Sequence, residues 1–397
     1  MPAAMSKLMK VSAVFILPAL AFAYAMFQGG FVSWFLFYSF LPFALYSILL
    51  FFYPVNFQAE RTVFPQTYNA GDDIEVNLTL KRKLPFPLLF LLIEDVMPDS
   101  LNHEKMKRVF FPGFKRNLKM AYTIRNASRG EHHLHCIRLK TGDALGLLEK
   151  EKRILCKQAI LVYPPYEDIF YKSFRSMLDQ GGVLSLSSSR NDTSLVAGIR
   201  EYEPGDRFSW IDWKASAKSN QMMTKEFETR ESNDFLIILD TAPANNFETL
   251  VKFAASASRT VIRNGGKAGM LIGGKEKVLL PPRSGAGQEA AIFYQLAKVS
   301  EDGSHELEHD LGDQALAGQS AVFVIITSRL SKQMVDGAGK LPGKNRRVFI
   351  FLMKGNEEIS TAEETALKAM AAGKGLNVHT VVGHNFRMAF AGVEQTR

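Results

Sequence analysis

The sequence predicts a multi-domain protein. We expect a transmembrane helical hairpin over residues 1–56, a β-sandwich-like domain over 57–165, a connecting segment over 166–232, and a doubly wound α/β domain over 233–397. Three observations lead to this prediction. No charged side chain occurs from residue 11 to residue 59, the next hundred residues hold short alternating runs, and strand and helix patterns then alternate.

The apolar segment divides at Gln28-Gly29-Gly30 into two runs, Val11–Phe27 and Phe31–Val55. As helices they would be about 25 Å and about 37 Å long. The hydrocarbon core of a bilayer is roughly 30 Å thick, so the first run is marginal and the second is ample. A cleaved signal peptide ending near Ala21 and Ala23, or a buried soluble hairpin, is the weaker alternative.

The chain of 397 residues carries a net charge of +8, and its position is informative. Residues 1–165 hold 20 Lys and Arg against 12 Asp and Glu, whereas residues 166–397 are balanced. Lys7 and Lys10 precede the first apolar run, and Arg61 follows the second. The positive-inside rule therefore predicts a protein of the inner (cytoplasmic) membrane with two spans and both termini in the cytoplasm. The same distribution argues against nucleic-acid binding.

The middle region is typical of an antiparallel sandwich. Residues Asp73–Leu80 alternate strictly between polar and apolar, as a half-buried strand should. Further strand candidates are Leu88–Ile93, Lys119–Ile124, His133–Leu139 and Ala159–Tyr163. We expect this domain to serve as a stalk or interaction module beside the membrane.

A histidine-rich tract lies within one of these strands. His133 and His135 would face one side of a strand, while His132 and Cys136 would face the other. This split separates the candidate ligands of a metal ion. We therefore expect solvated strand histidines rather than a metal site.

Residues 198–228 form the most distinctive stretch, and they follow a segment that predicts a helix and a Ser-rich loop. Seven Lys and Arg and eight Asp and Glu between 190 and 231 are interleaved with aromatic residues, which indicates ordered ion pairs packed over aromatic rings. Either the stretch braces the following sheet or it is a recognition surface, since Trp, Tyr and Arg dominate interface hot spots. A catalytic pair of Asp206 and Asp212 is the weakest reading, because no nucleophile or histidine lies nearby. The candidate residues are Arg200, Glu201, Tyr202, Gly205, Asp206, Ile211, Asp212, Trp213, Lys214, Lys225 and Glu228.

These residues carry a family resemblance. The strings Arg-Glu-Tyr-x-Pro-Gly-Asp, Ile-Asp-Trp-Lys-Ala-Ser-Ala and Lys-Glu-Phe-Glu resemble the signature of domain-of-unknown-function family 58. The resemblance implies a von Willebrand factor type A-like domain. It also implies a MoxR-type AAA+ ATPase as partner, often with a transglutaminase-like membrane protein, in chaperone-like assembly or cell-envelope maintenance.

The last region reads independently as α/β. Its strand candidates are Phe235–Leu239, Ala268–Ile272, Lys277–Leu280, Ala321–Thr327, Arg347–Leu352 and Val378–Val382, and its helix candidates are Phe247–Asn264, Glu289–Lys298 and Thr361–Ala372. Strands that alternate with helices predict a doubly wound parallel sheet. Ligand crevices of such sheets lie at the carboxyl ends of the strands, where Asp240 falls.

Von Willebrand-like domains usually hold Mg²⁺ at that crevice through Asp-x-Ser-x-Ser. In this chain Asp240 and Thr241 remain, but Ala242 and Ala244 replace the two serines. Alanine offers no oxygen ligand to a hard cation. We therefore expect a degenerate site with no metal and no other cofactor.

Two further motifs are discounted. Residues His305 to His309 match H-E-x-x-H, yet the acidic residues Glu308 and Asp310 favour an exposed helix over a zinc-protease site. Residues 337–345 superficially resemble a phosphate-binding loop, but Ala338 and Asn345 stand where Gly and Ser or Thr are required. We expect a loop there.

The sequence thus favours a non-catalytic, membrane-anchored interaction or scaffold protein working with a MoxR-type AAA+ ATPase. A Mg²⁺-dependent adhesion-type ligand-binding domain is the alternative, and a zinc hydrolase is the third choice. The expected contacts are protein partners and, through the hairpin, membrane lipid.

Overall fold

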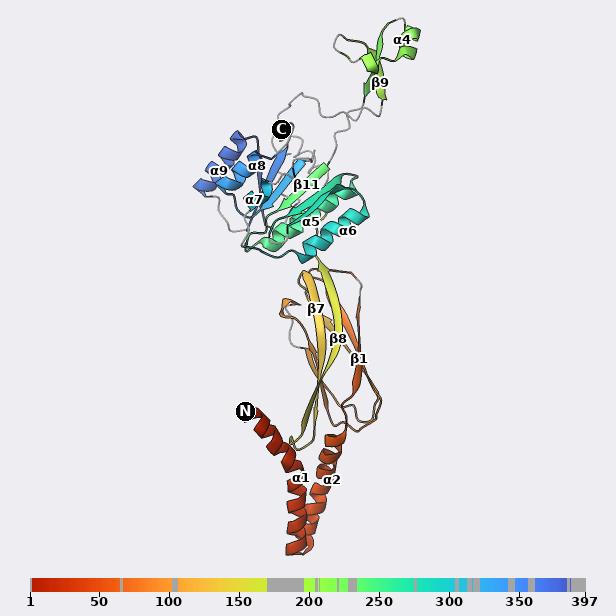
Figure 1. Ribbon diagram of the computed structural model, residues 1–397, viewed down its shortest axis with the longest axis vertical. Helices are drawn as coiled ribbons and strands as arrows, with labels where there is room; N and C mark the ends of the chain where they lie inside the picture. The colour runs from red at the N-terminus through yellow and green to blue at the C-terminus, as the bar shows by residue number, and fades with distance from the viewer. Residues whose placement is uncertain are drawn as a thin grey trace. The chain divides into compact units, whose positions relative to one another are not determined.

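The computed structural model describes residues 2–64, 67–101, 106–169, 196–203, 206, 208–219, 221–227, 234–274, 277–303, 307–312, 316, 322–341, 347–355, 361–383 and 386 (Figure 1). The chain divides into two compact units, Met1–Tyr163 and Pro164–Arg397.

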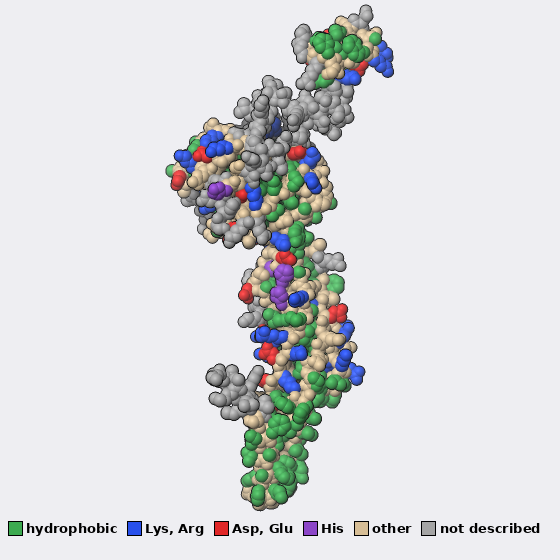
Figure 2. All heavy atoms as spheres, in the orientation of Figure 1, with side chains coloured by type: hydrophobic (Ala, Val, Ile, Leu, Met, Phe, Trp, Pro, Cys, Tyr) green, Lys and Arg blue, Asp and Glu red, His purple; other side chains and the backbone are tan. Residues whose placement is uncertain are grey.

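The first unit begins with two apolar helices, α1 (Pro2–Gln28) and α2 (Phe31–Phe52). Gly29 and Gly30 join them with φ angles of 58° and 89°, a conformation that glycine adopts without steric cost. Phe22 on α1 packs against the Trp34 and Phe37 rings of α2, with centroid distances of 6.4 and 5.6 Å. Hydrophobic side chains dominate the visible face of the hairpin where its side chains are described (Figure 2). Among the described residues, α2 is the helix both long and apolar enough to cross a membrane, and Ser12–Gln28 is a shorter apolar helix.

The rest of the first unit is a two-sheet sandwich. One sheet has the strand order β1-β3-β6 and the other the order β2-β8-β7-β4-β5. The strands are β1 (Phe57–Phe64), β2 (Tyr68–Asn69), β3 (Ile74–Arg82), β4 (Leu91–Val96), β5 (Met106–Phe110), β6 (Asn117–Ile124), β7 (Gly130–Gly142) and β8 (Glu149–Tyr163), with a 3-10 turn η1 (Asp99–Leu101) after β4. Most pairs are antiparallel, and the short β2 runs parallel to β8.

The sandwich core follows from the alternation seen in the sequence. Ile74, Val76, Leu78 and Leu80 of β3 are all buried and belong to one hydrophobic cluster with inward-facing residues of β4, β6, β7 and β8. Burying such side chains is the main source of stability for a two-layer sheet.

A buried ion pair connects the two sheets. Arg61 Nη2 of β1 lies 2.5 Å from Asp95 Oδ1 of β4, and the Tyr122 hydroxyl of β6 donates to the other carboxylate oxygen. Arg61, one of the cations that follow the second apolar run, is fully buried in this pair, so its charge is balanced inside the sandwich.

The histidine tract also departs from expectation at one position. His133 and His135 are exposed, as predicted, but His132 is buried. The His132 Nε2–H donates to the Ser128 carbonyl oxygen, and the Ser100 hydroxyl donates to Nδ1, each at 2.8 Å. Burial lowers the pKa of His132, so the neutral ring is favoured.

The α/β part of the second unit is a six-stranded sheet of order β13-β12-β11-β14-β15-β16. The order reverses at β11, which is the mark of a doubly wound sheet. The strands are β11 (Asp234–Leu239), β12 (Lys267–Ile272), β13 (Val278–Arg283), β14 (Val322–Thr327), β15 (Val348–Lys354) and β16 (Asn377–Val382). The helices are α5 (Phe247–Arg263), α6 (Ala286–Lys298), α7 (Leu307–Leu311), α8 (Lys332–Gly339) and α9 (Ala362–Gly373).

The predicted doubly wound parallel sheet has one antiparallel strand, at its edge. β13 runs antiparallel to β12, while the other neighbouring strands are parallel. Only residues 273–277 connect β12 to β13, and a parallel crossover needs a dozen residues or more. The edge position also tolerates Pro281 and Pro282, which lack the N–H that a central strand would need.

The expected loop at 337–345 is wrong at its start, because Gly337 to Gly339 end helix α8. The Ser331 hydroxyl caps that helix by accepting the Met334 N–H at 2.9 Å. Residues 342–346 lie outside the described part of the chain.

Candidate interaction surface

The family strings fold into a small module in the second unit. It consists of β9 (Val196–Glu201), η2 (Phe208–Trp210), α4 (Trp213–Ser219) and β10 (Met223–Phe227), which we call the motif module (Figure 1). β9 and β10 pair antiparallel. The Tyr202 N–H donates to the Met222 carbonyl and the Asp212 N–H to the Met223 carbonyl, at 2.8 and 2.9 Å. These bonds fasten the connecting residues to β10.

One ion pair closes the turn after β9. Arg200 Nη2 lies 2.7 Å from Asp206 Oδ1, and Asp206 Oδ2 accepts the Glu203 N–H at 3.1 Å. The hydrogen bond from Arg200, with that from the Glu203 backbone, lowers the pKa of Asp206. Both oxygens of this carboxylate therefore act in bracing the loop.

Asp212 caps helix α4. Its Oδ1 accepts the N–H groups of Lys214 and Ala215 at 3.1 and 3.0 Å, the usual role of an aspartate at a helix N-terminus. The Ser216 hydroxyl donates to the Asp212 carbonyl and accepts the Met223 N–H. Asp212 thus orients α4 on β10, and Asp206 and Asp212 are held by separate sets of partners rather than as a catalytic pair.

The bracing leaves large apolar side chains in solvent. Trp213 is 68% exposed and Phe208 is 72% exposed, and Ile199 and Met222 are also exposed. The Tyr202 ring stacks on Phe208 at a centroid distance of 6.1 Å. The prediction that ion pairs cover the aromatic rings is therefore wrong for Trp213.

The remaining candidates have mixed positions. Ile211 is buried, Lys225 is half-buried, and Glu201 and Lys214 are exposed, while Gly205 and Glu228 lie outside the described residues. The sequence reasoning missed Phe208, Ile199 and Met222 as surface residues. For Phe208 the available signal was its position next to the charged Arg207, in a stretch rich in polar residues.

Asp240, the candidate metal ligand, is buried at the carboxyl end of β11. Its Oδ2 accepts the Thr327 hydroxyl at 2.7 Å, and its Oδ1 accepts the Ala242 N–H at 3.0 Å. Thr241 is also buried, and Asp302 donates its N–H to the Thr241 carbonyl. The Asp240 carboxylate is thus used within the protein, and the two alanines add no oxygen, so this residue set does not fit Mg²⁺. Over the part of the chain that the structure describes, no three or more His, Cys, Asp or Glu side chains are grouped to hold a metal.

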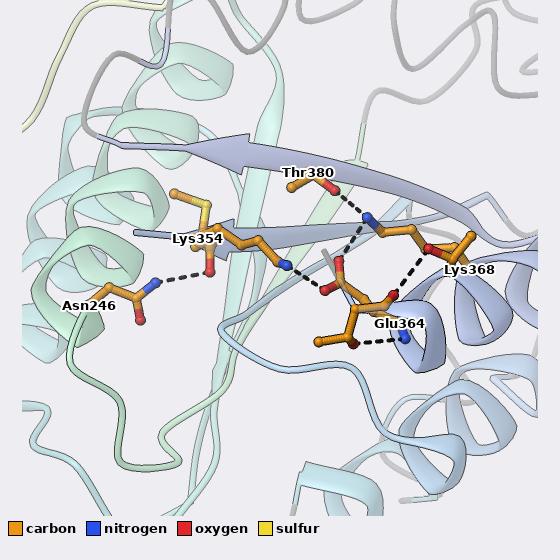
Figure 3. Close-up of polar contacts among 8 residues, drawn as sticks. Asn246, Lys354, Glu364, Lys368 and Thr380 are labelled. Atoms are coloured by element: carbon orange, nitrogen blue, oxygen red, sulfur yellow. Dashed lines mark hydrogen bonds and ion pairs between the residues drawn. The ribbon is translucent and has the colours of Figure 1, made fainter. Parts of the chain in front are cut away.

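A second polar cluster joins α9 to the ends of β15 and β16 (Figure 3). The Lys354 and Lys368 ammonium groups both pair with Glu364, and Lys368 also donates to the Thr380 hydroxyl at 2.8 Å. Burial alone would raise the pKa of Glu364, but the hydrogen bonds from the two lysines outweigh it and lower that pKa. Asn246 donates to the Met353 carbonyl beside this cluster. The contacts lock α9 to the sheet.

The zinc-protease match is only partly described. His305 and Glu306 lie outside the described residues, and His309 is exposed on the five-residue helix α7. The neighbouring Asp310 is buried, and Lys277 Nζ lies 3.1 Å from its Oδ1.

Comparisons with known proteins agree on one family. The profile described as "Protein of unknown function DUF58" matches residues 198–397. The uncharacterized protein YeaD of Bacillus subtilis (strain 168) is 39% identical over 365 residues, which span 89% of this chain and 91% of YeaD.

Solved structures offer only distant similarity. The sporulation control protein Spo0M of Bacillus subtilis aligns with 32% of this chain and 56% of its own, at 10% identity and a TM-score of 0.14. Cwp6 of Clostridium difficile aligns with 84% of this chain and 39% of its own, at 11% identity and a TM-score of 0.15. Scores this low carry no argument about fold or function. The family profile and the similarity to YeaD, in contrast, show the family: this chain belongs to the DUF58 family of proteins of unknown function.

Proposed function

We propose that this chain is a membrane-anchored, non-catalytic interaction protein that binds its partner through the exposed apolar side chains of the motif module. The observation that carries the proposal is that polar side chains of the module stabilise its fold while large apolar side chains remain exposed. Arg200, Asp206 and Asp212 hold the backbone, while Trp213 and Phe208 remain in solvent. Exposed tryptophan and phenylalanine on an ordered frame are typical anchors of protein interfaces.

The anchor in this proposal is the α1–α2 hairpin, with two spans and both termini in the cytoplasm. The apolar character of both helices and the cations Lys7 and Lys10 support it. Because Arg61 is buried, the cations after α2 that support the orientation are the exposed Lys81 and Lys83.

We propose a von Willebrand factor type A-like fold for the α/β part, acting as a metal-free scaffold. The sheet order with a single antiparallel edge strand and the placement of Asp240 beside the reversal point support this assignment. The proposed partner is a MoxR-type AAA+ ATPase, with a transglutaminase-like membrane protein as a second candidate. The support for both is the resemblance of the motif strings to the family, whose members typically occur with such proteins.

The test is binding of the full chain in lipid nanodiscs to a purified MoxR-type ATPase from the same cell. Trp213→Ala should weaken binding by at least about tenfold, as expected when a hot-spot side chain is removed. Tyr294→Ala, which removes a partly exposed aromatic ring from α6, is the matched control and should bind normally. Unchanged binding by the Trp213 variant would contradict the proposed surface.

A further inference from the structure

The carboxyl end of α2 is built into the β-sandwich. Leu50 is fully buried in the sandwich core, and the Ser47 hydroxyl donates to Asp143 Oδ2 at 2.7 Å. The Tyr46 hydroxyl accepts the Leu89 N–H at 3.2 Å. Lys150 Nζ then donates to the carbonyls of Phe51, in the last turn of the helix, and of Tyr53, the residue that follows it. The last two turns of α2 are therefore part of the sandwich domain.

Because of these contacts, only the part of α2 before Tyr46 can be surrounded by lipid on all sides. The part of α2 before Tyr46 is Phe31–Leu45, which is about 22 Å long at 1.5 Å per residue. The hydrocarbon core is about 30 Å thick. For the hairpin to reach across it, the adjoining end of the sandwich has to enter the membrane interface.

That end of the sandwich carries exposed apolar side chains. We call them the collar: Leu84, Leu89, Phe111, Phe114 and Leu145, each between 43% and 79% exposed. In Figure 2, hydrophobic side chains continue from the hairpin onto the adjoining end of the sandwich.

Two of the loops that carry the collar, residues 83–90 between β3 and β4 and residues 111–116 between β5 and β6, are fixed relative to α2. The Phe86 ring stacks on Tyr53 at a centroid distance of 4.5 Å, and the Tyr53 hydroxyl donates to the Leu84 carbonyl. The second loop is tied to the first, since Leu88 and Gly113 exchange backbone hydrogen bonds at 3.2 Å. Buried Arg82 adds a bond to the Gly113 carbonyl at 2.6 Å. The collar is thus held in place rather than free to fold away.

Cations occur in the same two loops. Lys83, Lys115 and Arg116 are exposed, and within the described residues none of the three forms an ion pair. Apolar side chains flanked by cations match the boundary between acyl chains and anionic headgroups.

We propose that the collar inserts into the headgroup–acyl boundary of the bilayer that holds the hairpin, and that Lys83, Lys115 and Arg116 bind phosphates of anionic phospholipids. This inference rests on the proposed membrane anchor. It makes the sandwich domain a membrane-seated base with a fixed tilt, rather than a free stalk.

Spin-label depth measurements on the full chain in nanodiscs test the inference. Single labels are placed at Phe114→Cys in the collar, Phe40→Cys in α2 and His133→Cys toward the other end of β7, after Cys136 and Cys156 are replaced by Ser. The Phe114 and Phe40 labels should be more accessible to oxygen than to a water-soluble nickel chelate, and the His133 label should show the reverse. A deep Phe40 label with an aqueous Phe114 label overturns the collar alone. An aqueous Phe40 label overturns the anchor as well.

Varying the lipid charge distinguishes binding of the collar to anionic headgroups from binding to a protein partner. Replacing phosphatidylglycerol by phosphatidylcholine, or introducing Lys115→Glu with Arg116→Glu, should move the Phe114 label toward water, while the Phe40 label stays deep. No response to either change overturns the anionic-lipid part of the inference. Protection of Phe114 only after a protein is added identifies a protein surface instead and overturns the inference.

Discussion

Two polar clusters in the second unit differ in what they leave exposed. At the sheet edge formed by β15 and β16, Lys354 and Lys368 both pair with Glu364 in a largely buried site. In the motif module, Arg200 pairs with Asp206, yet Trp213 and Phe208 face solvent. In both places, therefore, ion-paired side chains stabilise the local fold, and the presence of many charged residues does not by itself indicate a binding site. The exposed apolar surface is what distinguishes the module, and it is the basis for proposing a recognition site there.

The largest expected effect concerns the sheet edge. Glu364→Ala should lower the free energy of unfolding of the α/β part by about 3 kcal/mol, because it leaves the buried Lys354 ammonium without its carboxylate. Denaturant unfolding measures this. Glu363→Ala, an exposed neighbour in the same helical turn, should change stability by less than about 0.5 kcal/mol. Equal stability of the two variants would show that the cluster is not a structural lock.

A smaller effect is expected from the helix cap of the motif module. Asp212→Ala should destabilise α4 by about 1 kcal/mol, since two N–H groups lose their acceptor. Hydrogen exchange at the α4 amides should speed up, whereas Asp212→Ser should largely preserve protection. Lys214→Ala, which changes an exposed side chain next to the cap, serves as control. Partner binding should weaken with Asp212→Ala, because α4 carries Trp213.

The smallest effect is a pH dependence of the same module. Asp206 has a lowered pKa in the folded state, so its pairing with Arg200 contributes stability above the unfolded carboxyl pKa near 3.8. That contribution declines as the pH falls below 3.8 and is lost once the pH is below the folded pKa. A carboxyl ¹³C NMR titration of Asp206 should give a midpoint below 3.8. A midpoint at or above that value would remove Asp206 from the bracing, and Asp206→Asn should abolish this acid dependence.

Much of the architecture was predictable because it depends on local pattern. The strict alternation of residues 73–80 appears as β3, and the apolar run before Asp240 appears as β11, buried from Phe235 onward. Most of the strand and helix candidates after residue 233 appear as elements shifted by only a few residues. Here burial on one or both faces leaves a direct trace in the sequence.

What was missed depends on contacts between distant residues. The burial of His132 requires Ser100 from a different loop, and the burial of Arg61 requires Asp95 from another sheet. The direction of β13 follows from the five-residue connection that joins it to β12. The pattern of apolar residues predicts a strand there but not its direction. The exposure of Trp213 follows from the way Asp212 and Ser216 fix α4 on β10. No single-residue propensity encodes such geometry.

Hydroxyl-radical footprinting tests the central claim most directly. The full chain in nanodiscs is oxidised with and without a purified MoxR-type ATPase, and the modification of individual aromatic side chains is followed by mass spectrometry. The account predicts that oxidation of Trp213 and Phe208 falls in the complex while oxidation of Tyr294 is unchanged. Unprotected Trp213 and Phe208 in a formed complex would contradict the motif module as the interaction surface.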